Sequence, residues 1–99
     1  MDINVTKDGG VIRLKVTGEF NIYSAADIKA RLMELLSECH KMELDLEGVI
    51  EIDTSGVQLL LLAKREADML GKDFRLSACG DSVGSAMTLY NLKDFFRIQ

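Results

Sequence analysis

The sequence predicts an α/β fold in which a single mixed sheet of four or five strands carries helices mainly on one face. Segments with an apolar residue at every second position alternate with segments whose apolar residues recur at helical spacing, in the order β-β-α-β-α-β-α. Strands separated by helices require crossover connections, which give parallel strand pairs. The 99 residues, 47% of them hydrophobic and 28% charged, suit one domain spanning residues 1–99 with one core.

The first two segments are typical of a β-hairpin. Residues 3–6 and 11–16 alternate between apolar and polar side chains, and the turn sequence Lys-Asp-Gly-Gly at residues 7–10 separates them. The second strand is expected to end at Thr17 and Gly18.

A first helix is predicted from residue 25 to about residue 37. The apolar residues of this stretch recur at helical spacing, and charged residues fall between them. Ser24 precedes the helix and is expected to be its N-cap, with Asp27 in the first turn, where a negative charge is favoured.

A central strand is predicted at residues 42–46, and Gly48 is expected to close it. Residues 49–52 then lead to a helix over residues 57–70, with Gly71 as its C-cap. This second helix has apolar side chains nearly all round, so it is expected to be more buried than the first.

The last predicted elements are a strand at residues 74–78 and a third helix at residues 83–90, with capping residues at 80–82. An apolar tail follows and is expected to form a short turn or helix and then a terminal edge strand. Its apolar residues are Leu92, Phe95, Phe96 and Ile98.

The charge balance argues against several classes of function. Sixteen acidic and 12 basic residues give a net charge of −4, and no basic cluster is longer than Lys64-Arg65, so nucleic acid and anionic lipid are not expected ligands. No apolar run approaches the roughly 20 residues of a membrane span, and the first residues do not resemble a signal peptide. A cytoplasmic protein without direct membrane insertion is therefore expected.

Cys39, Cys79 and His40 do not predict a reactive centre. The two cysteines lie far apart in the sequence, and reduced thiols are expected in a protein without an export signal. His40 is the single histidine, which makes a four-ligand zinc site improbable. Neither a metal nor a cofactor is predicted.

The candidate functional motif is Asp53-Thr54-Ser55-Gly56, which lies where the central strand passes into the second helix. One interpretation is that the motif only begins a helix, because Ser55 with Gln58 three residues later fits a capping box. A hydroxyl at a helix N-terminus is also a favourable place for a phosphate group. A phosphoserine would add about −1.5 to −2 charges and repel a partner docked over the helix start.

Catalysis by Ser55 is not predicted. A serine nucleophile needs an adjacent base, and the single histidine lies at the end of another predicted helix. The sequence contains no Gly-x-Ser-x-Gly elbow, P-loop or Gly-x-Gly-x-x-Gly motif. Several acids are expected to crowd the approach to Ser55 and predict a partner with a basic surface: Glu43, Asp45, Glu47, Glu51 and Asp53.

The chain resembles a STAS domain of the anti-sigma factor antagonist type over almost its whole length. Residues 11–18 followed by Glu19-Phe20-Asn21 resemble the second strand of that family and its Gly-Glu-Leu-Asp segment. Residues 42–53 resemble the central strand, and Asp-Thr-Ser-Gly-Val at residues 53–57 resembles the Asp-Ser-Ser-Gly-Leu motif. Two positions depart from the family pattern: Thr54 keeps a hydroxyl, and Asn21 stands where an aspartate is usual.

The resemblance implies a bacterial partner-switching protein that is not an enzyme. In such proteins the serine that matches Ser55 is phosphorylated by a partner kinase. The unphosphorylated form binds an anti-sigma factor with a histidine-kinase-like ATPase fold and frees a sigma factor, and a serine phosphatase restores this form. ATP and magnesium belong to the partner, so this chain is expected to need no cofactor.

Two other branches of the family remain open as alternatives. One is a STAS subunit of a lipid-transport ABC system, and the other is a switch in a chemotaxis-like or second-messenger pathway. The chain itself is expected to be a monomer or a weak dimer. The predicted partner-binding surface comprises Asn21, Ile22, Tyr23, Ser24, Asp53, Thr54, Ser55, Gly56, Val57 and Gln58.

Overall fold

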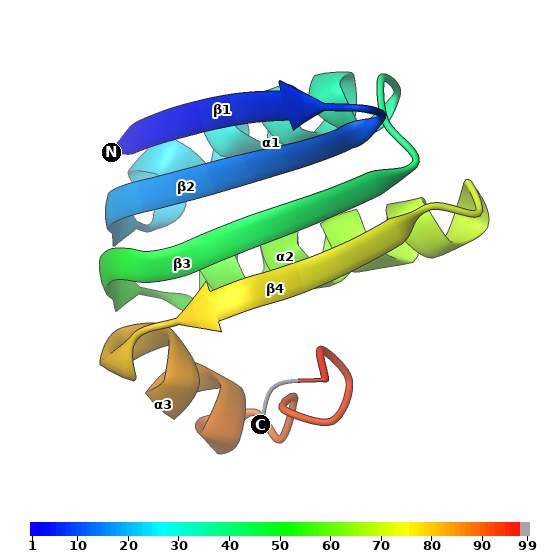
Figure 1. Cartoon of the computed structure of the whole chain (residues 1–99). Helices are drawn as coiled ribbons and strands as arrows, with labels where there is room; N and C mark the ends of the chain where they lie inside the picture. The colour runs from blue at the N-terminus through cyan, green and yellow to red at the C-terminus, as the bar shows by residue number, and fades with distance from the viewer. Residues whose placement is uncertain (98–99) are drawn as a thin grey trace.

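The computed structural model describes residues 1–97 and contains four strands and three helices within that range. Figure 1 shows the strands as one sheet with α1 and α2 behind it and α3 beside the end of β4. The elements are β1 (Asp2–Asp8), β2 (Val11–Phe20), α1 (Ile22–Leu36), β3 (Lys41–Ile52), α2 (Thr54–Met69), β4 (Asp73–Cys79) and α3 (Asp81–Leu89).

The sheet has the strand order β1-β2-β3-β4. β1 pairs with β2 in antiparallel fashion, whereas β2 with β3 and β3 with β4 are parallel pairs. The predicted mixed sheet with helices mainly on one face is therefore confirmed, with four strands. The hairpin turns at Gly9 and Gly10, both at positive φ (56° and 84°), as the tight turns between antiparallel strands require.

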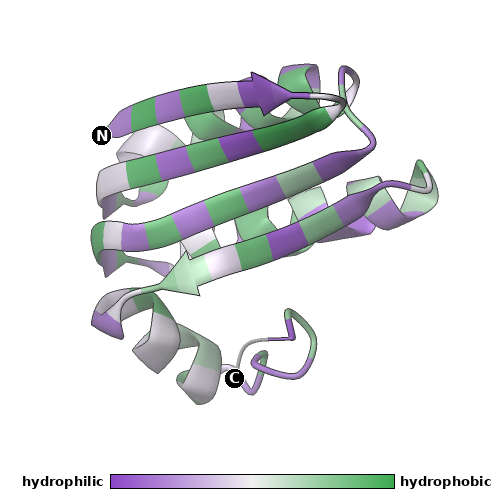
Figure 2. Ribbon diagram, in the orientation of Figure 1, coloured by the Kyte–Doolittle hydropathy of each residue, from purple (hydrophilic) through white to green (hydrophobic). Residues whose placement is uncertain are grey.

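Alternation along the strands divides the sheet into an apolar face and a polar face, as the striped colouring in Figure 2 shows. The apolar face is covered by α1 and α2. Its fully buried members on β2 and β3 include Ile12, Leu14, Val16, Phe20, Met42, Leu44 and Leu46. α2 has six buried residues and α1 has four, so α2 is the more buried helix, as predicted.

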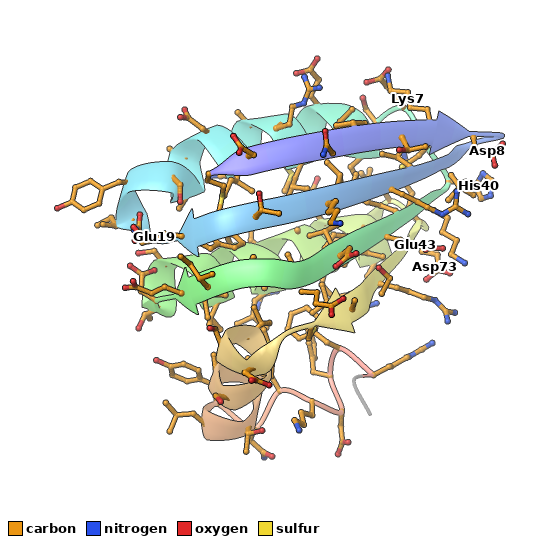
Figure 3. The ribbon with its side chains drawn as sticks, turned by 60° about the vertical axis from the view of Figure 1, so that its left-hand side comes forward. Lys7, Asp8, Glu19, His40, Glu43 and Asp73 are labelled. Atoms are coloured by element: carbon orange, nitrogen blue, oxygen red, sulfur yellow. The ribbon has the colours of Figure 1, made fainter. Side chains whose placement is uncertain are left out.

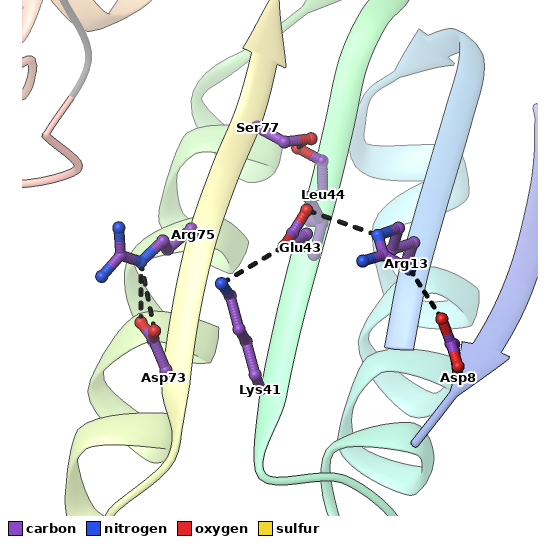
Figure 4. Close-up of polar contacts among 8 residues, drawn as sticks. All are labelled: Asp8, Arg13, Lys41, Glu43, Leu44, Asp73, Arg75 and Ser77. Atoms are coloured by element: carbon purple, nitrogen blue, oxygen red, sulfur yellow. Dashed lines mark hydrogen bonds and ion pairs between the residues drawn. The ribbon is translucent and has the colours of Figure 1, made fainter. Parts of the chain in front are cut away.

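The opposite face of the sheet carries ion pairs between neighbouring strands. Arg13 lies between Asp8 and Glu43, at 3.9 and 3.7 Å, and Lys41 reaches Glu43 at 3.4 Å (Figure 4). Pairs this exposed contribute at most about 1 kcal/mol each. This face is therefore a solvated surface whose charges are largely balanced.

The start of the first helix differs from the prediction. α1 begins at Ile22, three residues earlier than expected, and its N-cap is Asn21 in place of Ser24. Ser24 is the third helical residue and completes a capping box with Asn21. Asparagine and serine are both favoured at helix starts. From the third helical position the Ser24 side chain can still accept a hydrogen bond from the N-cap backbone, so Asn21 takes the N-cap position.

The central strand is longer than predicted and the second helix starts earlier. β3 runs for 12 residues and passes through Gly48, which pairs with Thr17 of β2 at an irregularity in the register. α2 begins at Thr54 with Asp53 as its N-cap, so the expected capping box of Ser55 and Gln58 is not formed. The carboxylate of Asp53 already occupies that capping position.

The chain after α3 forms turns up to Arg97, and within residues 1–97 it adds no fifth strand. Phe96 is buried and meets the ring of Phe95 edge to face, with the ring centroids 5.0 Å apart. Ile98, which the prediction placed in an edge strand, lies outside the described residues. Within the described part of the chain, no helix is long and apolar enough to cross a membrane.

Candidate functional site

The parallel pairing of β2 and β3 brings two helix starts to one edge of the sheet. Both strands end at this edge, where β2 leads into α1 and β3 leads into α2. The backbone N–H of Asp53 donates to the carbonyl of Phe20 at 3.2 Å, which holds the two strand ends together. The two halves of the predicted partner surface, residues 21–24 and 53–58, are therefore neighbours.

The Asp53 carboxylate joins the two helix starts directly. One oxygen, Oδ1, accepts a hydrogen bond from the N–H of Gly56 at 3.1 Å in the first turn of α2. The other, Oδ2, accepts from the N–H of Ile22 at 3.1 Å in the first turn of α1. One side chain thus satisfies a free N–H group on each helix and fixes their relative position.

The first turn of α1 is held by its own capping box. The Asn21 side chain accepts from the N–H of Tyr23 at 3.0 Å, and the Ser24 hydroxyl accepts from the N–H of Asn21 at 3.1 Å. The Ser24 hydroxyl also donates to the carbonyl of Glu19 at 3.1 Å. These bonds fix the first turn of α1, which carries Ile22 and Tyr23.

Gly56 allows α2 to approach β2 and β3 closely. A Cβ atom at this position would lie 2.7 Å from the side chain of Ile52 and 2.9 Å from the carbonyl oxygen of Phe20. The glycine of the motif is thus required by packing. Val57 is buried as well, so these two members of the predicted partner surface lie beneath it.

Ser55 lies at the rim of a shallow groove between α1 and α2. The groove has a volume of about 210 Å³ and is mainly apolar. Ser55 is half-buried, and within the described chain its hydroxyl makes no hydrogen bond. The groove is lined by Ala25, Ala26, Lys29, Ser55, Gln58, Leu59 and Leu62.

Two large side chains are exposed at the start of α1, whose first N–H group is bonded to Asp53 at the start of α2. Tyr23 is 91% exposed and Ile22 is 65% exposed. Exposed apolar residues that lie together are typical of protein-binding surfaces. They lie on the predicted partner surface, next to the helix that carries Ser55.

The acids named from the sequence do not all lie near Ser55. Figure 3 places Glu43 at the opposite end of the sheet from Glu19, which marks the edge where α1 begins. Glu43 is paired there with Arg13 and Lys41. The expectation that Glu43 crowds the serine is therefore wrong, because β3 is a full 12 residues long and Glu43 lies near its start.

The two cysteine thiols are not activated nucleophiles. Burial raises the pKa of Cys39 and that of Cys79 above the usual thiol value. A reactive cysteine requires the opposite shift. Both cysteines are free, as predicted, and residues 1–97 contain no group of three or more residues that could hold a metal ion.

Comparison with known families decides which family the chain belongs to. The family model STAS_2, described as "Mlab, STAS domain", matches residues 3–98. The chain belongs to the STAS_2 family. The expected family resemblance is therefore confirmed over nearly the whole chain.

Solved STAS domains share the fold at low sequence identity. An anti-sigma factor antagonist from Mycobacterium paratuberculosis superposes with a TM-score of 0.86 and 19% identity, over 96% of this chain and 81% of that one. The antagonist SpoIIAA in its unphosphorylated form gives 0.81 and 17%, over 94% and 84%. The phosphorylated form of the Bacillus cell fate determinant SpoIIAA gives 0.76 and 16%, over 94% and 86%.

Tyr90 is a neighbour of the STAS motif that sequence reasoning missed. Its hydroxyl lies 3.1 Å from the hydroxyl of Thr54, so the end of α3 contacts the start of α2. The two residues are 36 positions apart, and no spacing rule connects them. The position of Lys29 in the groove beside Ser55 was not predicted either. In the sequence it is one of several charged residues on the polar face of a predicted helix.

Proposed function

We propose that this STAS domain is an anti-sigma factor antagonist whose protein binding is regulated by phosphorylation of Ser55. In its unphosphorylated form it binds an anti-sigma factor that is also a serine kinase with a histidine-kinase-like ATPase fold, and thereby releases a sigma factor. Phosphorylation of Ser55 ends this binding, and a serine phosphatase restores it. The chain itself needs no cofactor and acts in the cytoplasm as a monomer or weak dimer.

The observation that carries the proposal is the position of Ser55. Its hydroxyl makes no hydrogen bond within the described structure, and the residue lies at the rim of the apolar groove between α1 and α2. A phosphate added there would place about −1.5 to −2 charges at the rim of this apolar groove. Docking a partner would then require desolvation of that charge, which is costly.

The rigid surroundings of Ser55 support a switch by charge and not by refolding. Asp53 already caps α2 and links it to α1, so the helix start does not depend on the serine hydroxyl. Structures of the similar protein SpoIIAA are known in its unphosphorylated and phosphorylated forms, and both share this fold. The proposal extends that behaviour to Ser55 of this chain.

The test uses the Ser55→Ala variant as bait in a lysate of the native host, followed by titration of the purified partner. Ser55→Ala is expected to bind as wild type does and to resist kinase treatment. Ser55→Asp is expected to lose binding while its thermal unfolding stays near wild type. Thr6→Asp, which adds the same charge on the exposed polar face of β1, serves as the control and should bind normally.

Two outcomes would contradict the proposal. If Ser55→Ala and Ser55→Asp bind alike and no kinase labels the chain, it acts as a constitutive subunit, as in a lipid-transport ABC system. If the partner belongs to a chemotaxis-like or second-messenger pathway, the switch stands but its output is different.

The charge of the partner can be tested in the same titrations. Glu47 and Glu51 are exposed on the part of β3 that leads to the motif. A partner with a basic surface should bind more weakly as the salt concentration rises, because salt screens attraction between exposed charges. Binding that does not change with salt would argue against a basic partner.

A further inference from the structure

We propose that Lys29 binds the phosphate group of phosphorylated Ser55, so that part of the added charge is neutralised within the molecule. The inference rests on the proposed function in one respect, namely that Ser55 is the modified residue. It gives α1 a part in the switch: the helix beside the modified one supplies the cation that receives the phosphate.

Lys29 and Ser55 line the same groove from opposite sides. Lys29 comes from α1 and Ser55 from the first turn of α2, and the groove between them is otherwise mainly apolar. Lys29 is the only charged residue among the groove-lining residues in the described structure. A phosphate on Ser55 would therefore meet one cation and little competing polar surface.

The direction of the two helices allows the Lys29 ammonium group to approach Ser55. α1 and α2 start at the same edge of the sheet because they follow the parallel strands β2 and β3. Side chains on a helix lean toward its N-terminus. The long stem of Lys29 can therefore reach toward the level of the first turn of each helix, where Ser55 lies.

Lys29 is exposed and free to bind. Within residues 1–97 it forms no ion pair, whereas Lys7, Lys41 and Lys64 each have a carboxylate partner. The nearest carboxylate in sequence to Ser55, that of Asp53, accepts hydrogen bonds from Ile22 and Gly56. Glu51 is exposed and adds only repulsion toward a phosphate.

Binding of the phosphate has a consequence for the groove. The ammonium group would be drawn over an apolar hollow whose walls include Ala25 and Leu59. Phosphorylation would then occlude the groove as well as charge its rim. A partner side chain that uses the hollow would be excluded even at salt concentrations that screen the charge.

The experiment places phosphoserine at position 55 during translation, so that occupancy does not depend on any kinase. The pH midpoint of the second ionisation of the phosphate, normally about 6, is followed by phosphorus NMR. A nearby cation favours the dianion and lowers this midpoint. Lys29→Gln is expected to raise the midpoint by about 0.2–0.7 pH units, as for a partly exposed ion pair.

Arg31→Gln is the matched control. It removes the same charge from the same helix, but its side chain lies two residues, or about 200°, around α1 from Lys29. Arg31→Gln should leave the midpoint within about 0.1 unit of wild type, since long-range effects of charge are screened. Equal shifts for the two variants, or no shift for Lys29→Gln, would overturn the inference.

The result is separable from the proposed function. If phosphoserine at position 55 does not weaken partner binding, the proposed switch fails, and the titration still reports whether Lys29 contacts the phosphate. If partner binding is lost but both variants titrate as wild type does, the switch stands and Lys29 has no part in it.

Discussion

At the scale of single residues, Gly56 is the member of the motif that packing explains most directly. A side chain there would meet Ile52 and the backbone of Phe20 at less than 3 Å. The backbone of Phe20 cannot move freely, because its side chain is fully buried at the end of β2. The close contact between α2 and the sheet therefore depends on the absence of a Cβ atom.

We expect Gly56→Ala to lower the free energy of unfolding by about 1–3 kcal/mol, the usual cost of overpacking a filled core. Gly84→Ala is the control, because a Cβ at Gly84 in α3 would meet nothing within 4 Å. That change should be neutral or stabilise by up to about 1 kcal/mol through helix propensity. Urea unfolding of both variants measures the difference, and equal effects would contradict the packing argument.

The thiols give a prediction for pH dependence. Burial raises the pKa of Cys39 and of Cys79, so the native protein holds less thiolate at a given pH than the unfolded chain. Alkylation by iodoacetamide at pH 8 should be slower in the native protein than in urea, and the native rate should keep rising above the usual thiol pKa. Equal native and unfolded rates would show that the thiols are not protected.

At the scale of elements, the contact between Thr54 and Tyr90 links α3 to the start of α2. α3 otherwise lies beside the end of β4, and its buried residues Val83 and Met87 hold it against the sheet. The hydrogen bond is exposed to solvent, so its net contribution is at most about 1 kcal/mol. Its effect is to place the end of α3 next to the STAS motif.

A double-mutant cycle with Thr54→Val and Tyr90→Phe measures this link. We expect a coupling energy of about 1 kcal/mol, typical of a net hydrogen bond between neutral groups. Thr88→Val replaces Tyr90→Phe in the control cycle, because the Thr88 hydroxyl donates to Gly84 within its own helix. That second cycle should be additive to within about 0.5 kcal/mol. A first cycle that is equally additive would mean that the two hydroxyls do not interact.

Sequence periodicity predicted every element that forms within residues 1–97. Its errors lie at boundaries where two residues could do the same task. Asn21 and Ser24 are both good N-caps, and only the folded loop shows that they form one capping box. A glycine such as Gly48 often marks the end of a strand. β3 continues through it because β2 lies alongside and pairs with the residues that follow.

The candidate site was predictable in composition but not in its connections. The motif and its neighbour at residues 21–24 could be found because local sequence signals mark both helix starts. The two hydrogen bonds of the Asp53 carboxylate depend on how β2 and β3 pair, and no local signal encodes that. The roles of Lys29 and Tyr90 depend in the same way on which helices become neighbours.

At the scale of the whole molecule, the fold combines one local hairpin with two parallel pairs that require long crossovers. Parallel pairs form late because the chain between the strands must be ordered first. The sequence contains no proline, however, so the slowest ordinary step of folding is missing.

We therefore expect refolding without a slow phase. After a jump from concentrated urea to dilute buffer, fluorescence of Tyr23 and Tyr90 or far-UV circular dichroism should recover with no component of tens of seconds. Adding a prolyl isomerase should leave the traces unchanged. A slow phase that persists at low protein concentration would have to come from the sheet topology itself.

The shared carboxylate of Asp53 has a consequence for how the molecule opens. Because the amide hydrogens of Ile22 and Gly56 are held by two oxygens of one side chain, rotation of that side chain releases both at once. In hydrogen exchange the two amides should lose protection together, although they belong to different helices. The beginnings of α1 and α2 thus form a single opening unit, and Ser55 lies inside it.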